Sequence, residues 1–386
     1  MTVGGVEVRV RGDPVVDWER SFTERTASQF AVSFAWARTA LATLLTAAGL
    51  EPGDEVLLSP LTCKVVPLAL LAAGLRPVYG DIREDTLNLD ATTLEPLRSE
   101  RTRAVLFQRT YGNAAGVAEA AAFAHAHGLF FVEDCAQCMP SPSAWCGDAA
   151  IFSNNPGKPL SAGSGGIALI RNAALADRVR TASRALPVTG RAAAQKAKTE
   201  AWVRNHALSP ALYWTAFNLN RRMDPSYRVR PLAVEIDEEI TALAARIHPV
   251  QARAGLAALA QADAVARHRT ACCDAYATML RDVPGLVLPC GGGEPLYYFP
   301  VLASRKDALL RAAQQRRIEI IAWPVRAPIY PIEDIASLEQ YGYAGGSRPV
   351  AENVALRLIG LPTHPLVDER QRRALRDLLH EHRAAA

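Results

Sequence analysis

The chain has 386 residues, a formal net charge of +4, 49% hydrophobic residues and 21% charged residues. This balance is typical of a globular protein with a large core and excludes intrinsic disorder, and the length favours two domains. So small a charge excess gives no support for nucleic acid as a partner.

The sequence also favours a cytoplasmic protein that binds no metal. Its first residues lack the charged and then apolar pattern of a signal peptide, and no uninterrupted apolar stretch is long enough to cross a membrane. The seven cysteines are scattered, and the two-residue gap between Cys135 and Cys138 has no second such pair to complete a zinc site. We therefore expect buried thiols and no contact with a membrane.

Near the N-terminus, residues 1–28 carry short alternating patterns that suit an arm leading into the first domain. Phe30–Phe34 is strand-like, and apolar residues at helical spacing follow it up to Leu50. The start of such a helix, at Ala37 and Arg38, offers free backbone N–H groups to an anion.

Strand and helix patterns then alternate. Val56–Leu58 and Ala104–Gln108 have the composition of buried strands, and helical patterns lie between such strands. Repeated strand–helix units predict a parallel sheet with helices on both faces.

The most informative stretch covers residues 131–170. Its apolar strand pattern ends on Glu133 and Asp134, and an acid at the carboxyl end of a strand points into a crevice. A second strand pattern ends on Ser153, and the Asn-Asn-Pro-Gly turn after it presents Lys158.

This order of residues suits the chemistry of pyridoxal phosphate (PLP). The Lys158 amine can form a Schiff base with the aldehyde, Asp134 can keep the ring nitrogen protonated, and the Ser153 hydroxyl can hold the phosphate. Each residue alone is explained as well by a surface lysine, a helix cap or a turn serine. The combination at this spacing favours the cofactor.

The strand pattern stops between residues 183 and 236, where we expect two helices, the second over residues 207–223. A long helix follows, and strands and helices alternate again after residue 284, which suggests a small α+β domain. We expect a large domain over residues 1–243, with the helical segment as an insertion, and a small domain over residues 244–386.

The chain resembles the DegT/DnrJ/StrS family of sugar aminotransferases. The resemblance rests on five elements in order, which are Glu133-Asp-Cys-Ala-Gln137, Gly147-Asp148, Phe152-Ser153, Lys158 and Gly165-Gly166. It implies the fold of the fold-type I PLP-dependent transferases, an α/β fold with a mostly parallel central sheet flanked by helices and a smaller C-terminal α+β domain.

The resemblance also implies a candidate site in which Lys158 and Asp134 are catalytic. The candidate cofactor-binding residues are Ala37, Arg38, Cys63, Asp134, Gln137, Ser153 and Lys158, and the candidate substrate-binding residues are Arg326 and Tyr330. Gln137 would lie near the ring hydroxyl, and Arg326 would meet the carboxylate of the amino donor. Cys63 takes the place at which the family has an aromatic residue stacked on the ring, and Ala244 the place of an asparagine that reaches the partner subunit's cofactor.

The activity implied by the resemblance is that of a PLP-dependent aminotransferase. It would move an amino group from glutamate or glutamine to a nucleotide-linked keto-sugar or a keto-cyclitol, for antibiotic or surface-polysaccharide biosynthesis, as a cytoplasmic homodimer. Two alternatives remain open. One is a PLP enzyme of the same fold that catalyses elimination or dehydration, although the family's dehydratases carry histidine in place of Lys158. The other is a non-catalytic regulator with this fold, because the stacking aromatic and the asparagine are lost.

Overall fold

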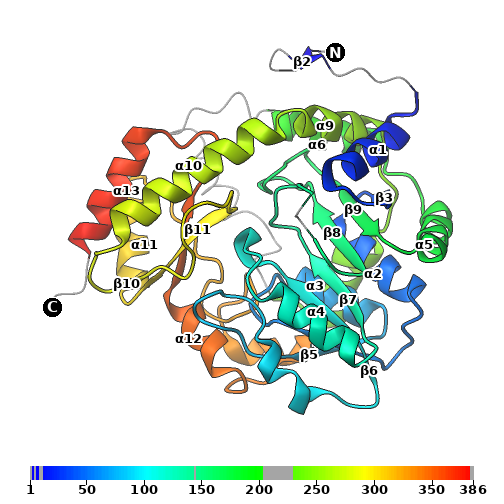
Figure 1. Cartoon of the computed structure of the whole chain (residues 1–386), viewed down its shortest axis with the longest axis horizontal. Coiled ribbons are helices and arrows are strands. Elements are labelled where there is room, and N and C mark those ends of the chain that lie inside the picture. Colours follow the sequence, from blue (N-terminus) through cyan, green and yellow to red (C-terminus); the bar gives the residue numbers. More distant parts are fainter. Residues whose placement is uncertain (1, 4–5, 8–11, 143–144, 203–228, 383–386) are drawn as a thin grey trace.

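Two sheets of unequal size form the frame of the molecule (Figure 1). The computed structural model describes residues 2–3, 6–7, 12–142, 145–202 and 229–382. The helix expected over residues 207–223 lies outside the described residues.

The larger sheet has seven strands, and its strand pairing is mostly parallel. Strand β9 runs antiparallel to both of its neighbours, and the remaining neighbours in this sheet are parallel. The predicted mostly parallel α/β sheet is confirmed. In order across the sheet the strands are β3 (Phe30–Phe34), β9 (Gly166–Ile170), β8 (Ala149–Ser153), β7 (Phe130–Asp134), β6 (Thr102–Gln108), β4 (Glu55–Leu58) and β5 (Arg76–Tyr79).

Helices cover both faces of the larger sheet, because its strands bury successive side chains on opposite sides. In β4, Val56 and Leu58 belong to the apolar cluster under α2 and α3, whereas Leu57 belongs to the cluster under α4. The helices of one face are α2 (Ala37–Ala47), α3 (Val65–Ala72) and α5 (Ala173–Ala185), and those of the other are α1 (Pro14–Thr26), α4 (Val117–Ala126) and α9 (Pro249–Leu259).

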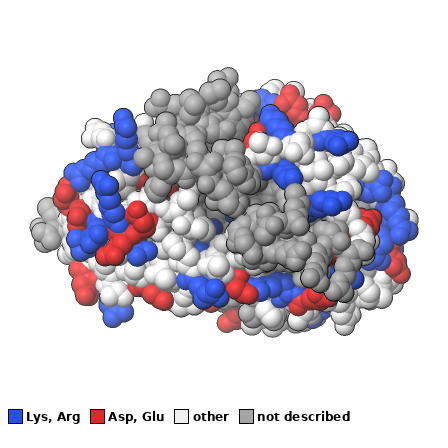
Figure 2. Space-filling model, turned by 90° about the horizontal axis from the view of Figure 1, so that it is seen from above, with Lys and Arg blue, Asp and Glu red and all other residues white. Residues whose placement is uncertain are grey.

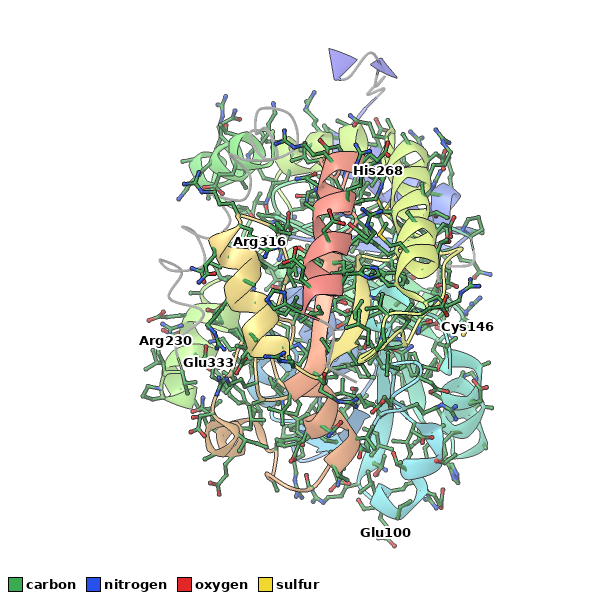
Figure 3. All side chains as sticks on the ribbon, turned by 90° about the vertical axis from the view of Figure 1, so that its left-hand side faces the viewer. Glu100, Cys146, Arg230, His268, Arg316 and Glu333 are labelled. Atoms are coloured by element: carbon green, nitrogen blue, oxygen red, sulfur yellow. The ribbon has the colours of Figure 1, made fainter. Side chains whose placement is uncertain are left out.

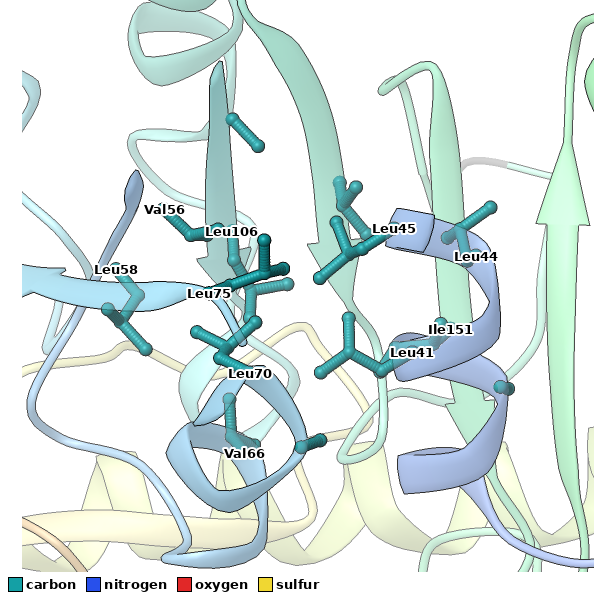
Figure 4. Packing of buried hydrophobic residues seen from close by; sticks show 14 of the residues in the cluster. Leu41, Leu44, Leu45, Val56, Leu58, Val66, Leu70, Leu75, Leu106 and Ile151 are labelled. Carbon is teal, nitrogen blue, oxygen red and sulfur yellow. The ribbon is translucent and has the colours of Figure 1, made fainter. Parts of the chain in front are cut away.

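Figure 4 shows the first of these faces from close by. Leu41 and Leu45 of α2 and Leu70 of α3 turn toward one another over the sheet residues Leu106 and Ile151. Burial of one such side chain contributes about 1.5–3 kcal/mol. This packing fixes where α2 begins, at the edge of the sheet where the site lies.

The smaller sheet is antiparallel and has three strands, β10 (Leu286–Val287), β11 (Tyr298–Ala303) and β12 (Leu358–Pro362). The helices around it are α10 (Ala262–Leu280), α11 (Lys306–Gln315), α12 (Pro349–Arg357) and α13 (Glu369–Glu381). Helix α13 lies between α10 and α11 (Figure 3), and an ion pair of 2.5 Å joins Arg316 to Glu381. This part has the predicted α+β pattern, while the boundary after residue 243 stays a prediction.

Within the described part of the insertion, α6 (Arg191–Trp202) is helical as predicted, whereas α8 (Leu232–Ile236) is a short helix that the sequence analysis did not predict. The remaining short elements are strands β1 (Thr2–Val3) and β2 (Val6–Glu7) and short helical segments at Ala91–Thr93, Glu95–Leu97, Thr110–Gly112, Asp237–Thr241 and Ile335–Tyr341.

Charges of both signs are interspersed over the described surface in the view of Figure 2. Within the described ranges, no helix combines the length and the apolar character that spanning a membrane requires.

A buried ion pair ties the end of the insertion to the loop before α3. The Nζ atom of Lys64 lies 2.8 Å from Oε1 of Glu235, and the two side chains are 1% and 0% exposed. The hydroxyl of Tyr341 donates to the second oxygen of Glu235 at 2.6 Å. Because Lys64 directly follows Cys63, this pair helps to hold the candidate site's loop in place.

We predict that Glu235→Leu lowers the free energy of unfolding by about 3–5 kcal/mol, because it removes the carboxylate that balances the buried charge of Lys64. The double variant Lys64→Met with Glu235→Leu should recover most of this loss. Urea unfolding measures both, with Asp85→Asn in the exposed pair of Arg83 and Asp85 as a control that changes stability by at most about 1 kcal/mol. A double variant as unstable as Glu235→Leu would contradict the prediction.

Candidate active site

The candidate site lies along one edge of the larger sheet, where the carboxyl ends of its parallel strands meet. Strand pairing sets Gln108 beside Asp134 and sets Ser153 beside Gly166. Gly166 pairs on its other side with Phe34, the last residue of β3. Ligands of open α/β sheets bind at such an edge.

Asp134 is the buried acid of this edge. Its side chain is 3% exposed and accepts a hydrogen bond of 2.9 Å from the backbone N–H of Ala136. Burial raises the pKa of Asp134, while that hydrogen bond and the nearby charge of Lys158 act in the opposite direction. The structure thus brings the predicted lysine and the predicted acid together.

Lys158 lies on a loop whose ends are joined by backbone hydrogen bonds. The backbone N–H of Asn154 donates to Gly165 at 2.8 Å, and the N–H of Ala162 donates back to Asn154 at 2.9 Å. Gly157 has φ +82°, a conformation that glycine adopts without strain, so the turn places the half-buried Lys158 at the mouth of the loop.

The start of α2 meets β9 with no space between the two backbones. A Cβ atom on Gly166 would lie 2.3 Å from the backbone nitrogen of Ala37. No side chain caps the first turn of α2. Its first N–H groups are therefore candidate donors to an anion beside Ser153, and this role stays a prediction.

Thr39 is a residue of this turn that the sequence reasoning missed. Its side chain is 5% exposed, and its hydroxyl finds no hydrogen-bond partner among the described residues. A buried hydroxyl without a partner costs free energy, which a bound group with oxygen atoms would recover. The unsatisfied Thr39 hydroxyl and the uncapped start of α2 are both suited to binding a phosphate group.

The guanidinium of Arg38 pairs with Glu239 and is not available to bind a phosphate group. Its Nη1 atom lies 2.5 Å from a carboxylate oxygen of Glu239, and both side chains are largely buried. Arg38 can therefore contribute its backbone N–H to an anion, while its charge is balanced by Glu239.

Cys63 and Tyr330 lie side by side, although the sequence separates them widely. The N–H of Lys64 donates to the carbonyl of Tyr330 at 2.7 Å, and the N–H of Tyr330 donates to Thr62 at 2.8 Å. The hydroxyl of Thr62 in turn donates to Gln108 at 2.7 Å, which ties this pair to the end of β6. Both Cys63 and Tyr330 are half-buried.

Gln137 holds the loop after β6. Its side-chain oxygen accepts a hydrogen bond of 2.6 Å from the backbone N–H of Tyr111. Tyr111 has φ +56°, an unusual conformation for a non-glycine residue, and this hydrogen bond helps to hold it.

Arg326 lies on the surface, more than half exposed, and its guanidinium is 2.7 Å from a carboxylate oxygen of Asp307. Its neighbour Lys306, which the sequence reasoning missed, is buried and donates to the carbonyls of Pro324 and Val325 at 2.8 and 2.7 Å. Burial lowers the pKa of Lys306 to about 7. Lys306 thereby anchors the loop that leads to Tyr330.

Tyr297 is the third residue that the sequence reasoning missed as part of the site. The Nζ atom of Lys158 lies 5.7 Å from the centre of its ring.

Within the part of the chain that the structure describes, no three metal-ligating side chains come together.

Comparison with known proteins shows the family of this chain. The model of the DegT/DnrJ/EryC1/StrS aminotransferase family matches residues 5–378. The chain belongs to this family and is an aminotransferase.

Two solved structures and one curated relative illustrate the likeness. The dTDP-3-amino-3,4,6-trideoxy-alpha-D-glucose transaminase of Streptomyces venezuelae is 27% identical over 385 residues, which cover 96% of this chain and 87% of the relative. The structure of S. venezuelae DesV with a ketimine intermediate has a TM-score of 0.74 and 26% identity, and covers 97% of this chain and 90% of DesV. Bacillus subtilis NtdA, solved with bound PMP, shares the fold at a TM-score of 0.71 and 18% identity, over 96% and 77% of the two chains.

We predict that Asp134→Asn stabilises the cofactor-free protein at pH 7 by on the order of 1–3 kcal/mol. Because the pKa of Asp134 is raised in the folded state, the wild type loses stability as pH rises through that pKa, and the asparagine variant does not. The gain should shrink as the pH falls toward 3.8, the ordinary value. Urea unfolding between pH 4 and pH 8 measures it.

The matched control is Asp81→Asn, which should destabilise at pH 7. The two oxygens of Asp81 accept hydrogen bonds from the N–H groups of Ile82, Val350 and Ala351 at 2.8, 3.0 and 2.9 Å, and an amide has one oxygen fewer. A loss of stability in Asp134→Asn at pH 7 would contradict the prediction.

Gly166→Ala should lower the free energy of unfolding by about 1–3 kcal/mol and weaken the binding of PLP, because the new methyl group displaces the start of α2. Thermal melting and a titration with PLP measure the two effects. Gly190→Ala is the control, since nothing lies within 4 Å of its added Cβ. Unchanged PLP affinity in Gly166→Ala would count against an anion site at this helix start.

Proposed function

We propose that the chain binds PLP at this edge and uses Lys158 to transfer amino groups. The observation that carries the proposal is the buried Asp134 within electrostatic reach of Lys158, beside a helix start whose N–H groups no side chain caps. The aminotransferase family and the relative solved with PMP support this cofactor.

The phosphate would lie at the start of α2. The backbone N–H groups of Ala37 and Arg38 and the hydroxyls of Ser153 and Thr39 are the donors that this edge offers to it. Phosphates bind at helix starts because N–H groups and the helix dipole both favour negative charge there.

The ring would lie between Cys63 and the loop of Gln137, with Asp134 at its nitrogen. When bound, PLP supplies an electron sink that makes the α-carbon of an amino acid acidic. A carboxylate at Asp134 stabilises a proton on the ring nitrogen, and a positive ring nitrogen in turn favours the charged form of Asp134. A thiol at Cys63 is polarisable, so it can pack against a ring face without an aromatic side chain.

Lys158 has two tasks in the proposed reaction. Its amine would hold the cofactor aldehyde until the amine of the donor replaces it. The released amine would then be the base for the proton at the α-carbon of the donor and the acid that returns this proton. Tyr330, beside Cys63, and Arg326 are the proposed contacts to substrate.

The proposed donor is glutamate or glutamine, and the proposed acceptor is a nucleotide-linked keto-sugar or a keto-cyclitol. The S. venezuelae transaminase, whose name specifies a dTDP-linked amino sugar, supports the sugar. A homodimer is likewise a proposal, supported by the family.

Lys158→Ala should lower amino transfer by at least about 10²- to 10⁴-fold, the usual contribution of a positioned acid or base. The assay follows ¹⁵N from labelled glutamate or glutamine into dTDP-linked 3-keto and 4-keto sugars and an inosose. Lys196→Ala is the control, because Lys196 is exposed on α6 and pairs loosely with Glu200. Transfer at the wild-type rate by Lys158→Ala would overturn the proposal.

A further inference from the structure

Tyr297 brings the smaller sheet into contact with the lysine of the larger one. It directly precedes β11, and the centre of its ring lies 5.7 Å from the Nζ atom of Lys158. Both side chains are half-buried. A lysine within about 6 Å of an aromatic face is attracted to it, by about 0.5–1 kcal/mol where exposed and more where water is excluded.

The backbone of Tyr297 is fixed from both sides. Its N–H donates to the carbonyl of Tyr111 at 2.7 Å, which joins it to the loop after β6. Its carbonyl accepts hydrogen bonds from Arg269 at 2.8 Å and from the hydroxyl of Thr363 at 2.9 Å. Arg269 and Thr363 are 3% and 0% exposed, so these contacts persist away from water.

Arg269 has a second contact with the same residue, since its guanidinium carbon lies 5.9 Å from the centre of the Tyr297 ring. Arg269 belongs to α10, and its Nη1 atom also lies 2.7 Å from the hydroxyl of Thr363. The backbone of Tyr297 is therefore held by a buried arginine on a long helix, by Thr363 after β12 and by the turn after β6. These contacts restrict where the ring can lie relative to Lys158.

We propose that the ring of Tyr297 is the surface that holds the Lys158 amine whenever that amine is not bound to the cofactor. This inference rests on the proposed function. After the donor releases it, the Lys158 side chain could adopt many rotamers, and proton transfer requires the few that keep its nitrogen over the reacting carbons. Once the Lys158 amine has taken the proton it is an ammonium, and its attraction to a fixed aromatic face selects the rotamers from which that proton is delivered, which makes Tyr297 a positioning residue.

The sequence explains why such a residue is needed here. The loop over residues 59–74 contains no aromatic residue, and the half-buried Cys63 stands at the candidate ring slot. The aromatic face that lies 5.7 Å from the Lys158 amine comes from the other sheet. It is tied to the larger sheet through Tyr111 rather than through the Cys63 loop.

The test compares Tyr297→Leu, which removes the aromatic face, with Tyr297→Phe, which keeps it. The first measurement uses cofactor-free protein, treated with formaldehyde and cyanoborohydride, with methylation of each lysine followed by peptide mass spectrometry. The ring holds the ammonium form, which does not react. We expect Lys158 to be methylated about tenfold faster in Tyr297→Leu and at the wild-type rate in Tyr297→Phe, with Lys196 unchanged in every variant.

The second measurement is the single-turnover reaction of PLP-loaded enzyme with glutamate and with α-deuterated glutamate. In Tyr297→Leu, the rate at saturating glutamate should fall about tenfold, the isotope effect should rise, and the glutamate concentration for half-saturation should stay the same. Tyr297→Phe should stay within about twofold of wild type. A residue with only a structural role would not change the isotope effect.

Three results would overturn the inference. Wild-type behaviour of Tyr297→Leu in both measurements would exclude a role for the ring, and a Tyr297→Phe variant as slow as Tyr297→Leu would assign the effect to the hydroxyl. Wild-type protein that exchanges no amino group would overturn the proposed function and the role of Tyr297 with it. The methylation contrast, which needs no cofactor, would still report whether the ring contacts the Lys158 amine, so the two failures are distinguishable.

Discussion

The burial of one carboxylate, that of Asp134, is the constraint on which the rest of the site depends. A carboxyl group that is 3% exposed and accepts one backbone hydrogen bond is costly to ionise, and its raised pKa expresses that cost. The charge of Lys158 offsets part of it. A cationic ring nitrogen would offset more, so binding of the proposed cofactor would recover part of the cost of ionising Asp134.

The surrounding elements serve to keep this acid dry and to place donors around it. Parallel strands end together at one edge, and the close approach of Gly166 to Ala37 presses the start of α2 against that edge. The buried pair of Lys64 and Glu235 and the carbonyl ligands of Lys306 hold two further loops at the same place. Each contact is buried, so each is worth more than it would be in water.

The sequence predicted the parts of the site that are local in the chain. Asp134, Ser153 and Lys158 fall within one stretch, and the ends of neighbouring parallel strands meet at one sheet edge, so their placement at that edge could be predicted without coordinates. The mostly parallel sheet was predicted from the alternation of strand and helix patterns along the sequence. The positions of these residues can be predicted because they depend on a sequence pattern within one short stretch of the chain.

Tyr297, Lys306 and Thr39 could not be inferred in the same way. Tyr297 contacts Lys158 only because the two sheets pack together. In the sequence, Lys306 cannot be told from an ordinary charged residue at a helix start, although it is buried in the structure. The ion pair of Arg38 with Glu239 has the same origin, because the residues are 201 positions apart. The spacing of apolar residues does not predict such contacts, because they depend on how helices and strands pack against one another.

The most direct test of the account is to locate the bond between protein and cofactor. Protein purified with PLP is reduced with borohydride, digested and analysed by peptide mass spectrometry. The account predicts a pyridoxyl phosphate group on Lys158, and less of it on the same residue in Asp134→Ala. A modification confined to other lysines, with Lys158 unmodified in the wild type, would contradict it.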